Sequence, residues 1–177
     1  MLEIASGTGE HAAWLAPRLR PLAWQPSDAD PEMLASIAAH AAEANADNLR
    51  RPIPLDVTLP DWPRTASAAS KDAVPTAIVN INMIHIAPWA AAEGLMAGAG
   101  QLLRTGEILY LYGPFRVGGK HTAPSNEAFD RGLRARNAAW GVRDLEAVAA
   151  LAASHGLALR ETIEMPANNL SVIFVRR

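Results

Sequence analysis

The sequence predicts one α/β domain over residues 1–177, in which helices cover both sides of a single mixed β-sheet. Three observations lead to this prediction. Strand-like segments alternate with helical segments along most of the chain, a glycine-rich turn joins the first strand to the first helix, and only "PANN" separates the last two strands. Because four residues cannot hold a crossover helix, the last two strands must be antiparallel.

The individual elements follow from apolar spacing and from turn residues. Apolar residues recur at helical spacing after the glycine turn, Asp30 and Pro31 provide a helix start, and Gly156 provides a helix end. The stretch "TAIVNINMIHI" begins with the β-branched, apolar residues of a buried strand. The predicted strands are 1–5, 22–26, 53–57, 76–86, 107–115, 157–165 and 170–177. The predicted helices are 10–19, 31–44, 88–103, 126–136 and 143–155. The segments 59–72 and 114–126 are predicted to be irregular.

Composition excludes several classes of protein. The 177 residues are 50% hydrophobic and 19% charged, with a formal net charge of -2 and no cysteine. There are no long Lys/Arg runs of a nucleic-acid-binding surface, and no disulfide or thiolate metal site can form. No apolar run approaches membrane-spanning length, and no signal peptide is recognisable. We therefore expect a cytoplasmic protein with no nucleic-acid or membrane partner.

The glycine turn "EIASGTGEH" predicts a ligand site. Gly7, Gly9 and Ala12 satisfy the dinucleotide pattern G-x-G-x-x-A, and Asp28 follows at the distance of a ribose-binding acid. A tight turn without a ligand is the simpler alternative. These residues alone do not identify the ligand.

Three further features favour a cationic ligand with ribose hydroxyls over a pyrophosphate. Glu3 lies within the first strand, Asp56 ends the third, and the antiparallel C-terminal pair replaces the second half of a full dinucleotide-binding domain. Ligands of open α/β sheets bind outside the carboxyl ends of the strands. We expect Glu3, Asp28 and Asp56 to surround one crevice there.

At this point a family resemblance becomes specific. "LEIASGTGEH" resembles motif I of class I S-adenosylmethionine-dependent methyltransferases, "SDADPEML" their second-strand motif, and "LDV" their third-strand motif. The stretches "WQPSD", "INMIHIAPW", "LYGPF", "HTAPSNEAFD", "WGVRDLE" and "MPANNL" resemble the methyltransferase-like 26 family, a domain of unknown function. The resemblance implies a three-layer Rossmann-like methyltransferase fold with a seven-stranded sheet in the order 3-2-1-4-5-7-6 and strand 7 antiparallel.

The resemblance also implies a cofactor, S-adenosylmethionine, and its contacts. The backbone from Ala5 to Gly9 approaches the methionine portion, and Glu3 orients this loop or the ammonium group. Asp28 accepts hydrogen bonds from the ribose hydroxyls and Asp56 from the adenine amine. The implied cofactor-binding residues are Glu3, Ala5, Ser6, Gly7, Gly9, Asp28, Asp56, Val57, Asn82 and Met83. Ala5 departs from the family motif, which has glycine there.

The sequence identifies the residues that would take part in the chemistry less specifically than those that would bind the cofactor. Methyl transfer needs alignment of the acceptor and, for some acceptors, a base. The catalytic candidates are His85, Tyr112 and His121, and the substrate-binding candidates are His85, Trp89, Pro114, Asn126, Asn168 and Asn169. Each has a structural alternative, such as capping, packing or turn formation. The remaining histidines have no partner at metal-ligand spacing, so we predict no metal site.

The sequence therefore favours a methyltransferase with an unidentified acceptor, either a small molecule or a protein group, of which we expect the small molecule. An NAD-dependent oxidoreductase and a non-catalytic cofactor-binding or interaction protein stay open as alternatives. The chain begins directly with a strand, so we expect a helical segment that normally precedes it to be missing. The uncovered N-terminal face is then expected to mediate homo-oligomer formation or to bind a partner chain.

Overall fold

The computed structural model describes residues 1–69 and 74–177. The main strands are β1 (Leu2–Ile4), β2 (Gln25–Asp28), β3 (Ile53–Pro54), β4 (Ala77–Ile81), β5 (Ile108–Gly113), β8 (Leu157–Met165) and β9 (Asn169–Arg176). The α-helices are α1 (Glu10–Leu15), α2 (Pro31–Ala44), α3 (Trp62–Ala69), α4 (Trp89–Leu102), α5 (Pro124–Arg136) and α6 (Leu145–Ser154). Short 3₁₀ helices are η1 (Ala16–Leu19), η2 (Met83–His85) and η3 (Pro166–Asn168).

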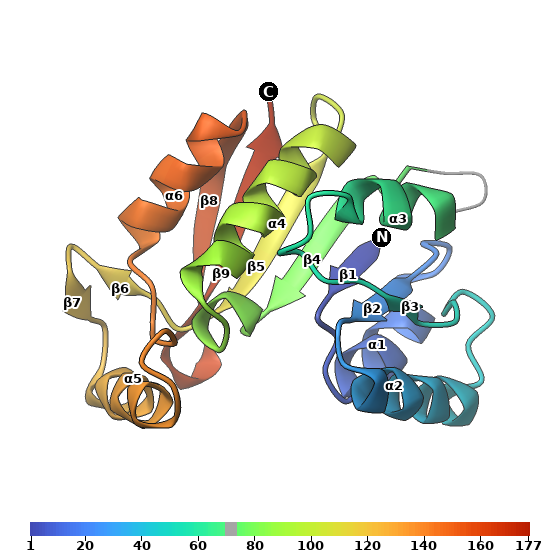
Figure 1. Cartoon of the computed structure of the whole chain (residues 1–177), viewed down its shortest axis with the longest axis horizontal. Coiled ribbons are helices and arrows are strands. Elements are labelled where there is room, and N and C mark those ends of the chain that lie inside the picture. Colours follow the sequence, from blue (N-terminus) through green and yellow to red (C-terminus); the bar gives the residue numbers. More distant parts are fainter. Residues whose placement is uncertain (70–73) are drawn as a thin grey trace.

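The seven main strands form one sheet in the order β3-β2-β1-β4-β5-β9-β8 (Figure 1). The pairs from β3 to β5 are parallel, whereas β9 is antiparallel to both of its neighbours, β5 and β8. Counted along the sheet, this is the predicted order 3-2-1-4-5-7-6 with the seventh strand antiparallel. The predicted fold class is confirmed.

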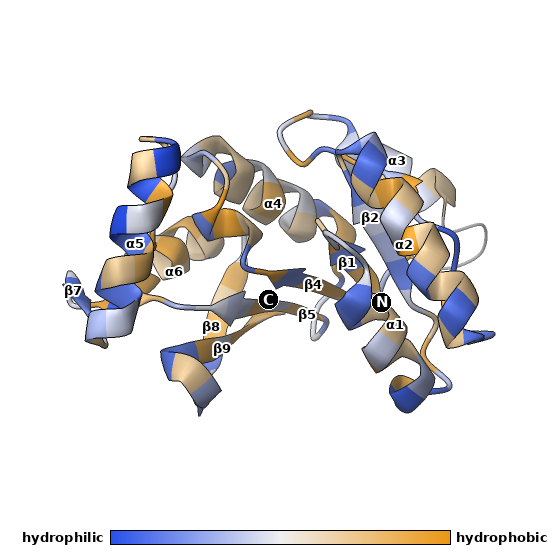
Figure 2. Cartoon of the chain, turned by 90° about the horizontal axis from the view of Figure 1, so that it is seen from below, coloured by the Kyte–Doolittle hydropathy of each residue, from blue (hydrophilic) through white to orange (hydrophobic). Residues whose placement is uncertain are grey.

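Helices lie on both sides of the sheet. On one side α4 packs against α3 and α6, and on the other α1 packs against α2 (Figure 2). The larger hydrophobic core lies between the sheet and α4, and includes Leu95, Met96, Leu109 and Phe174. Within residues 1–69 and 74–177, no helix covers β4 and β5 on the α1 side (Figure 2). The carboxyl ends of the parallel strands are therefore accessible beside the turn that follows β1.

The main correction to the predicted elements is α3, which occupies residues 62–69 of the segment predicted to be irregular. Trp62 is buried and its indole N–H donates to the Gly94 carbonyl of α4 over 3.0 Å. The indole also lies where a Cβ on Gly98 would be, 2.0 Å from the nearest ring atom. This tertiary contact stabilises a helix whose small polar residues resemble a loop. Residues 70–72 of the predicted loop lie outside the described residues.

Other boundaries differ more modestly. The second strand covers Gln25–Asp28 rather than 22–26, and the long predicted strand 76–86 ends at Ile81, where Asn82 adopts a left-handed φ of 62° and η2 begins. The third strand ends at Pro54, so Asp56 follows it by two residues. The predicted insertion contains a small hairpin, β6 (Arg116–Val117) with β7 (Lys120–His121), and the start of α5.

Candidate functional site

The glycine-rich turn after β1 is held in place by hydrogen bonds that its N–H groups donate to β2. Ser6 N donates to Ser27 O over 2.8 Å, and Gly7 N donates to Asp28 Oδ2 over 2.9 Å. Ala5, Gly7 and Gly9 all have positive φ, at 54°, 58° and 92°. Ala5 thus takes the left-handed conformation that glycine adopts without penalty, and which is unfavourable for a residue with a Cβ.

Gly9 is required for a second reason, the close packing of α1 on α2. A Cβ at Gly9 would lie 2.7 Å from the Ile37 Cα on α2. Helix α2 itself begins where the sequence predicts, because the Asp30 side chain accepts from Glu32 N over 2.8 Å and Pro31 fills the first position. Local sequence therefore fixes the start of α2, whereas contacts with Ile37 and β2 fix the turn.

Asp28 is the last residue of β2 and lies directly beside the turn. It is 8% exposed, and its two carboxylate oxygens accept from Gly7 N and Asp30 N. A carboxylate offers about four acceptor positions, so two remain for further donors. The arrangement fits a ribose diol, which brings two hydroxyl donors.

Glu3 faces inward and is 1% exposed. Its Oε2 accepts from Ser6 Oγ over 2.8 Å and from Trp24 Nε1 over 3.0 Å. Burial raises the pKa of the Glu3 carboxyl, and the two hydrogen bonds partly offset that effect. Of the two roles expected for Glu3, this geometry fits the orientation of the loop. Its role at the ammonium group stays a prediction.

Asp56 and Val57 belong to the turn after β3. Asp56 Oδ1 accepts from both the N–H and the hydroxyl of Thr58, which leaves Oδ2 for another donor. Asp56 also lines a cavity of about 330 Å³ together with Ala29, which follows Asp28, and Leu55. Val57 is buried, and its carbonyl lies 1.9 Å from the position of a Cβ on Gly94. An adenine-sized ring has room beside Asp56.

The segment after β4 brings Asn82, Met83 and His85 to the carboxyl edge of the sheet. Asn82 N donates to Tyr112 O over 2.8 Å, so this turn is tied to the end of β5. Gly113 passes close by: a Cβ there would lie 2.8 Å from Asn82 Oδ1 and 2.9 Å from His85 Nε2. Met83 is buried, and Asn82 is partly exposed.

His85, expected as a base or substrate contact, is fully enclosed. It is 0% exposed, its Nδ1 accepts from Arg143 N over 3.3 Å, and its ring meets Phe115 edge to face with centroids 4.9 Å apart. Burial, followed by the nearby Arg143 charge, lowers the pKa of His85 to about 3. Its buried Nε2 has no hydrogen-bond partner among the described residues. These contacts give His85 a packing role and leave its catalytic and substrate-binding roles predictions.

His121 lies in β7, against α5. Its Nε2 is 3.6 Å from Asp130 Oδ2, and Asp130 also accepts from Arg134 Nε and Val142 N. The pKa of the Asp130 carboxyl is lowered, because these hydrogen bonds outweigh the effect of burial. The contacts hold the β6–β7 hairpin and α5 to the segment before α6. They give His121 a structural role and leave its catalytic role a prediction.

Several substrate-binding candidates form one polar cluster at the η3 hairpin. Asn169 Nδ2 donates to the Tyr112 hydroxyl over 3.2 Å, and Asn126 Nδ2 donates to Asn168 O over 2.9 Å. Asn168 Nδ2 donates to Ser125 Oγ over 3.1 Å. The structure therefore brings together Tyr112 of β5, Ser125 and Asn126 of α5, and Asn168 and Asn169 of the hairpin, three elements that are far apart in the sequence.

Trp89 and Pro114 lie outside that cluster. Trp89 begins α4 and is partly buried, with the Arg143 guanidinium 5.6 Å from its ring centroid. Pro114 is buried immediately after β5. For both residues, packing is sufficient to explain the position.

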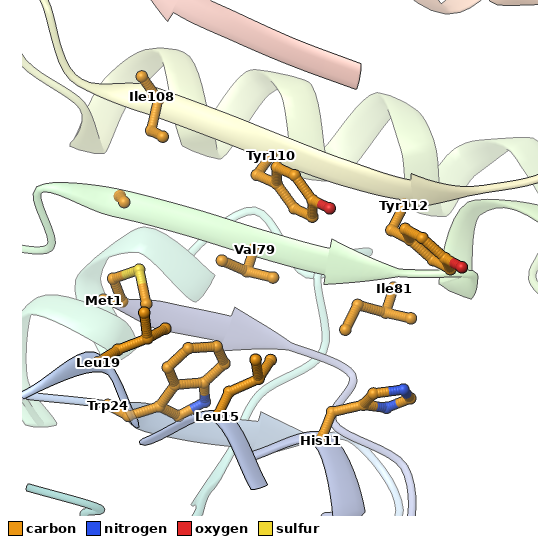
Figure 3. Close-up of a pocket in the computed structure, with 11 residues that line it drawn as sticks. Met1, His11, Leu15, Leu19, Trp24, Val79, Ile81, Ile108, Tyr110 and Tyr112 are labelled. Carbon is orange, nitrogen blue, oxygen red and sulfur yellow. The ribbon is translucent and has the colours of Figure 1, made fainter. Parts of the chain in front are cut away.

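An apolar cleft of about 450 Å³ lies on the uncovered side of β4 and β5, beside α1 (Figure 3). Val79, Ile81 and Tyr110 form its floor, and Leu15 and Leu19 form one wall. His11 and Tyr112 lie at the end of the cleft near the carboxyl ends of the strands (Figure 3). Sequence analysis did not identify this set, because its members are typical core residues that become a surface only where no helix covers them.

Two residues that sequence analysis did not single out, Trp24 and Asn80, support the turn through hydrogen bonds. Trp24 holds Glu3, as described above, and also lines the apolar cleft. Asn80 on β4 donates from Nδ2 to Ile4 O over 3.0 Å. Asn80 had a signal in the sequence, since a polar residue interrupts an otherwise apolar strand. Trp24 had none.

The described residues contain neither a group of metal ligands nor a helix that could span a membrane. Over residues 1–69 and 74–177, no three His, Asp or Glu side chains are grouped so that they could hold a metal ion. In the same part of the chain, no helix has both the length and the hydrophobicity needed to cross a membrane.

A family model described as "Protein of unknown function (DUF938)" matches residues 1–176, and the chain belongs to this family. Its fold is that of known methyltransferase structures. An O-methyltransferase family protein from Burkholderia thailandensis matches with a TM-score of 0.81 at 14% identity, over 99% of this chain and 50% of that one. The structure described as "PigF with SAH" matches with a TM-score of 0.77 at 12% identity, over 99% and 50%.

A third structure, described as "A Pericyclic Reaction enzyme", matches with a TM-score of 0.76 at 14% identity, over 99% of this chain and 42% of that one. The chain thus spans about half the length of the solved structures it matches. The shared fold also accompanies more than one kind of chemistry, so function must be argued from the site.

Proposed function

We propose that this chain is an S-adenosylmethionine-dependent methyltransferase domain that acts on a small-molecule acceptor. The observation that carries the proposal is the hydrogen-bonded unit of the glycine-rich turn and Asp28, at the carboxyl edge of a sheet with one antiparallel strand. The solved structures with this fold include O-methyltransferases. The resemblance of six sequence stretches to the methyltransferase-like 26 family is part of the same proposal.

The described residues fit the proposed cofactor. Asp28 retains acceptor capacity for the ribose hydroxyls, and Asp56 Oδ2 and the cavity beside Ala29 suit the adenine. The backbone from Ala5 to Gly9 and the turn at Asn82 and Met83 would contact the methionine portion. The cofactor supplies an activated methyl group, so this chain need only bind and align the acceptor.

The acceptor site is proposed at the polar cluster of Tyr112, Asn126, Asn168 and Asn169. This cluster lies beyond β5, next to the turn that carries Asn82. Its amides and hydroxyl orient a neutral polar acceptor better than a charged one. His121 and Tyr112 stay the candidates for proton transfer.

Thermal protection tests the proposal against the oxidoreductase alternative. S-adenosylhomocysteine is expected to raise the melting temperature of the chain in a concentration-dependent way, and NAD is expected to have a smaller effect. Protection by NAD alone would favour the oxidoreductase. Protection by S-adenosylhomocysteine without methyl transfer to any metabolite pool would favour the non-catalytic alternative.

A further inference from the structure

We propose that Asn80 is a positioning residue that holds the glycine-rich turn in its binding conformation; the identity of the ligand rests on the function proposed above. Asn80 lies on β4 directly beside Ile4 in the parallel register and is 1% exposed. Its Nδ2 donates to Ile4 O over 3.0 Å. Its Oδ1 has no hydrogen-bond partner among the described residues.

An asparagine is an unfavourable choice for this position on packing grounds alone. The neighbouring strand residues Ile78 and Val79 are buried and apolar, and a buried amide oxygen without a partner is costly. A leucine of similar size would fill the same space without that cost. The hydrogen bond to Ile4 O is the benefit that an apolar side chain would lose.

That carbonyl belongs to the peptide plane that joins Ile4 to Ala5. Fixing the plane limits the rotation that sets φ of Ala5, the residue held at 54°. From the other side, β2 holds the next two residues through the bonds Ser6 N to Ser27 O and Gly7 N to Asp28 Oδ2. The turn is therefore clamped between β4 and β2, on either side of β1.

The clamp explains how alanine can replace glycine at position 5. Without Asn80, Ala5 relaxes toward an ordinary negative φ in the free protein, and the ligand must restore the left-handed conformation. The penalty for that conformation corresponds to a loss of affinity of about tenfold. A glycine at position 5 removes the penalty, so it is expected to compensate for the loss of Asn80.

The test uses Asn80→Leu, the matched control Asn48→Leu, and Asn80→Leu combined with Ala5→Gly. Asn48 also donates from Nδ2 to backbone carbonyls, those of Ala16 and Leu22, and its Oδ1 likewise has no partner among the described residues. Asn48 lies away from the turn. Calorimetry with S-adenosylhomocysteine is the first readout, and hydrogen exchange of the Ser6 and Gly7 amides in the free protein is the second.

Asn80→Leu is expected to weaken binding about tenfold. The distant Asn48→Leu should change binding by less than about twofold. Adding Ala5→Gly to Asn80→Leu should recover most of the affinity. Faster exchange of the Ser6 and Gly7 amides is expected in Asn80→Leu and not in Asn48→Leu.

Unchanged affinity and exchange in Asn80→Leu would overturn the proposal, as would a loss of affinity that Ala5→Gly does not compensate. If the wild-type chain does not bind S-adenosylhomocysteine, the proposed function fails. The exchange rates of the two amides then decide the role of Asn80 on their own.

Discussion

The backbone N–H of Gly7 donates to Asp28 Oδ2 over 2.9 Å, so the turn after β1 and the acid at the end of β2 form one hydrogen-bonded unit. Asp28 also accepts from Asp30 N, which leads directly into the capped start of α2. A site organised in this way loses little conformational freedom on binding. The predictions below test this unit and the fold that supports it.

Replacing Gly98 with alanine tests the docking of α3, the helix that the sequence did not predict. A Cβ at Gly98 would lie 2.0 Å from the Trp62 ring, so Gly98→Ala should destabilise the protein by about 1–3 kcal/mol. Gly132→Ala on α5 is the control, because nothing lies within 4 Å of its Cβ position. It should stabilise by up to about 1 kcal/mol. Urea unfolding measures both, and equal effects of the two substitutions would contradict the packing described.

The enclosure of His85 predicts a loss of stability at acidic pH. Its pKa is about 3 in the folded state and near 6.5 in the unfolded state, so between these values only the unfolded state binds the proton. Stability therefore falls as the pH falls below 6.5, by about 2 kcal/mol between pH 7.5 and 5 from this group. Glu3 acts in the opposite direction, because its raised pKa makes the folded state bind a proton first as the pH falls.

Comparison of His85→Gln with the wild type isolates the contribution of His85 to the pH dependence of stability, because Glu3 is present in both proteins. Urea unfolding at pH 7.5 and 5 should show a smaller loss for His85→Gln than for the wild type. Should this variant not fold, NMR titration of the wild-type ring gives the same information. An imidazole that protonates near pH 6.5 in the folded protein would contradict the enclosure.

The apolar cleft beside α1 predicts self-association, and we propose a second copy of the chain as its occupant. The floor and walls of the cleft are apolar, and contact with a second copy would remove these side chains from water. Leu19→Lys places a charge in the cleft wall and should shift the population toward monomers. Leu159→Lys, at a similarly exposed leucine on β8 that does not line the cleft, is the control. Light scattering that shows a monodisperse wild-type monomer would contradict this proposal.

The sequence was sufficient for the topology because local signals determine it. The four-residue link before β9 forces an antiparallel pair, and the glycines after β1 mark a strand-to-helix turn. It was not sufficient for α3, whose stability comes from Trp62 packing on α4 across a gap of 36 residues to Gly98. Nor does a sequence reveal that His85 is enclosed by Phe115 and Arg143, which arrive from later segments.

The candidate site, like the fold, could be predicted where local sequence determines it and not where tertiary packing does. Asp28 and the glycine-rich turn were predicted from their spacing, whereas the direction of the Glu3 side chain depends on Trp24, 21 residues away. The side chain of a residue in a strand can point to either face of the sheet, and only the packing of the sheet selects the face. The polar cluster around Tyr112 forms where β5, α5 and the hairpin at η3 meet. Because the sequence does not show that these elements meet, the members of the cluster were predicted singly and not as a group.

The most direct test of the proposed function is calorimetric binding of S-adenosylhomocysteine to the wild type and to Asp28→Ala, with Asp30→Ala as the control. Asp30→Ala removes the same charge two residues away but affects only the cap of α2. Charge-assisted hydrogen bonds contribute about 1.5–3 kcal/mol each, so Asp28→Ala should weaken binding at least about tenfold. Asp30→Ala should leave it nearly unchanged. Equal binding by the wild type and Asp28→Ala, or no binding by the wild type, would contradict the proposed cofactor site.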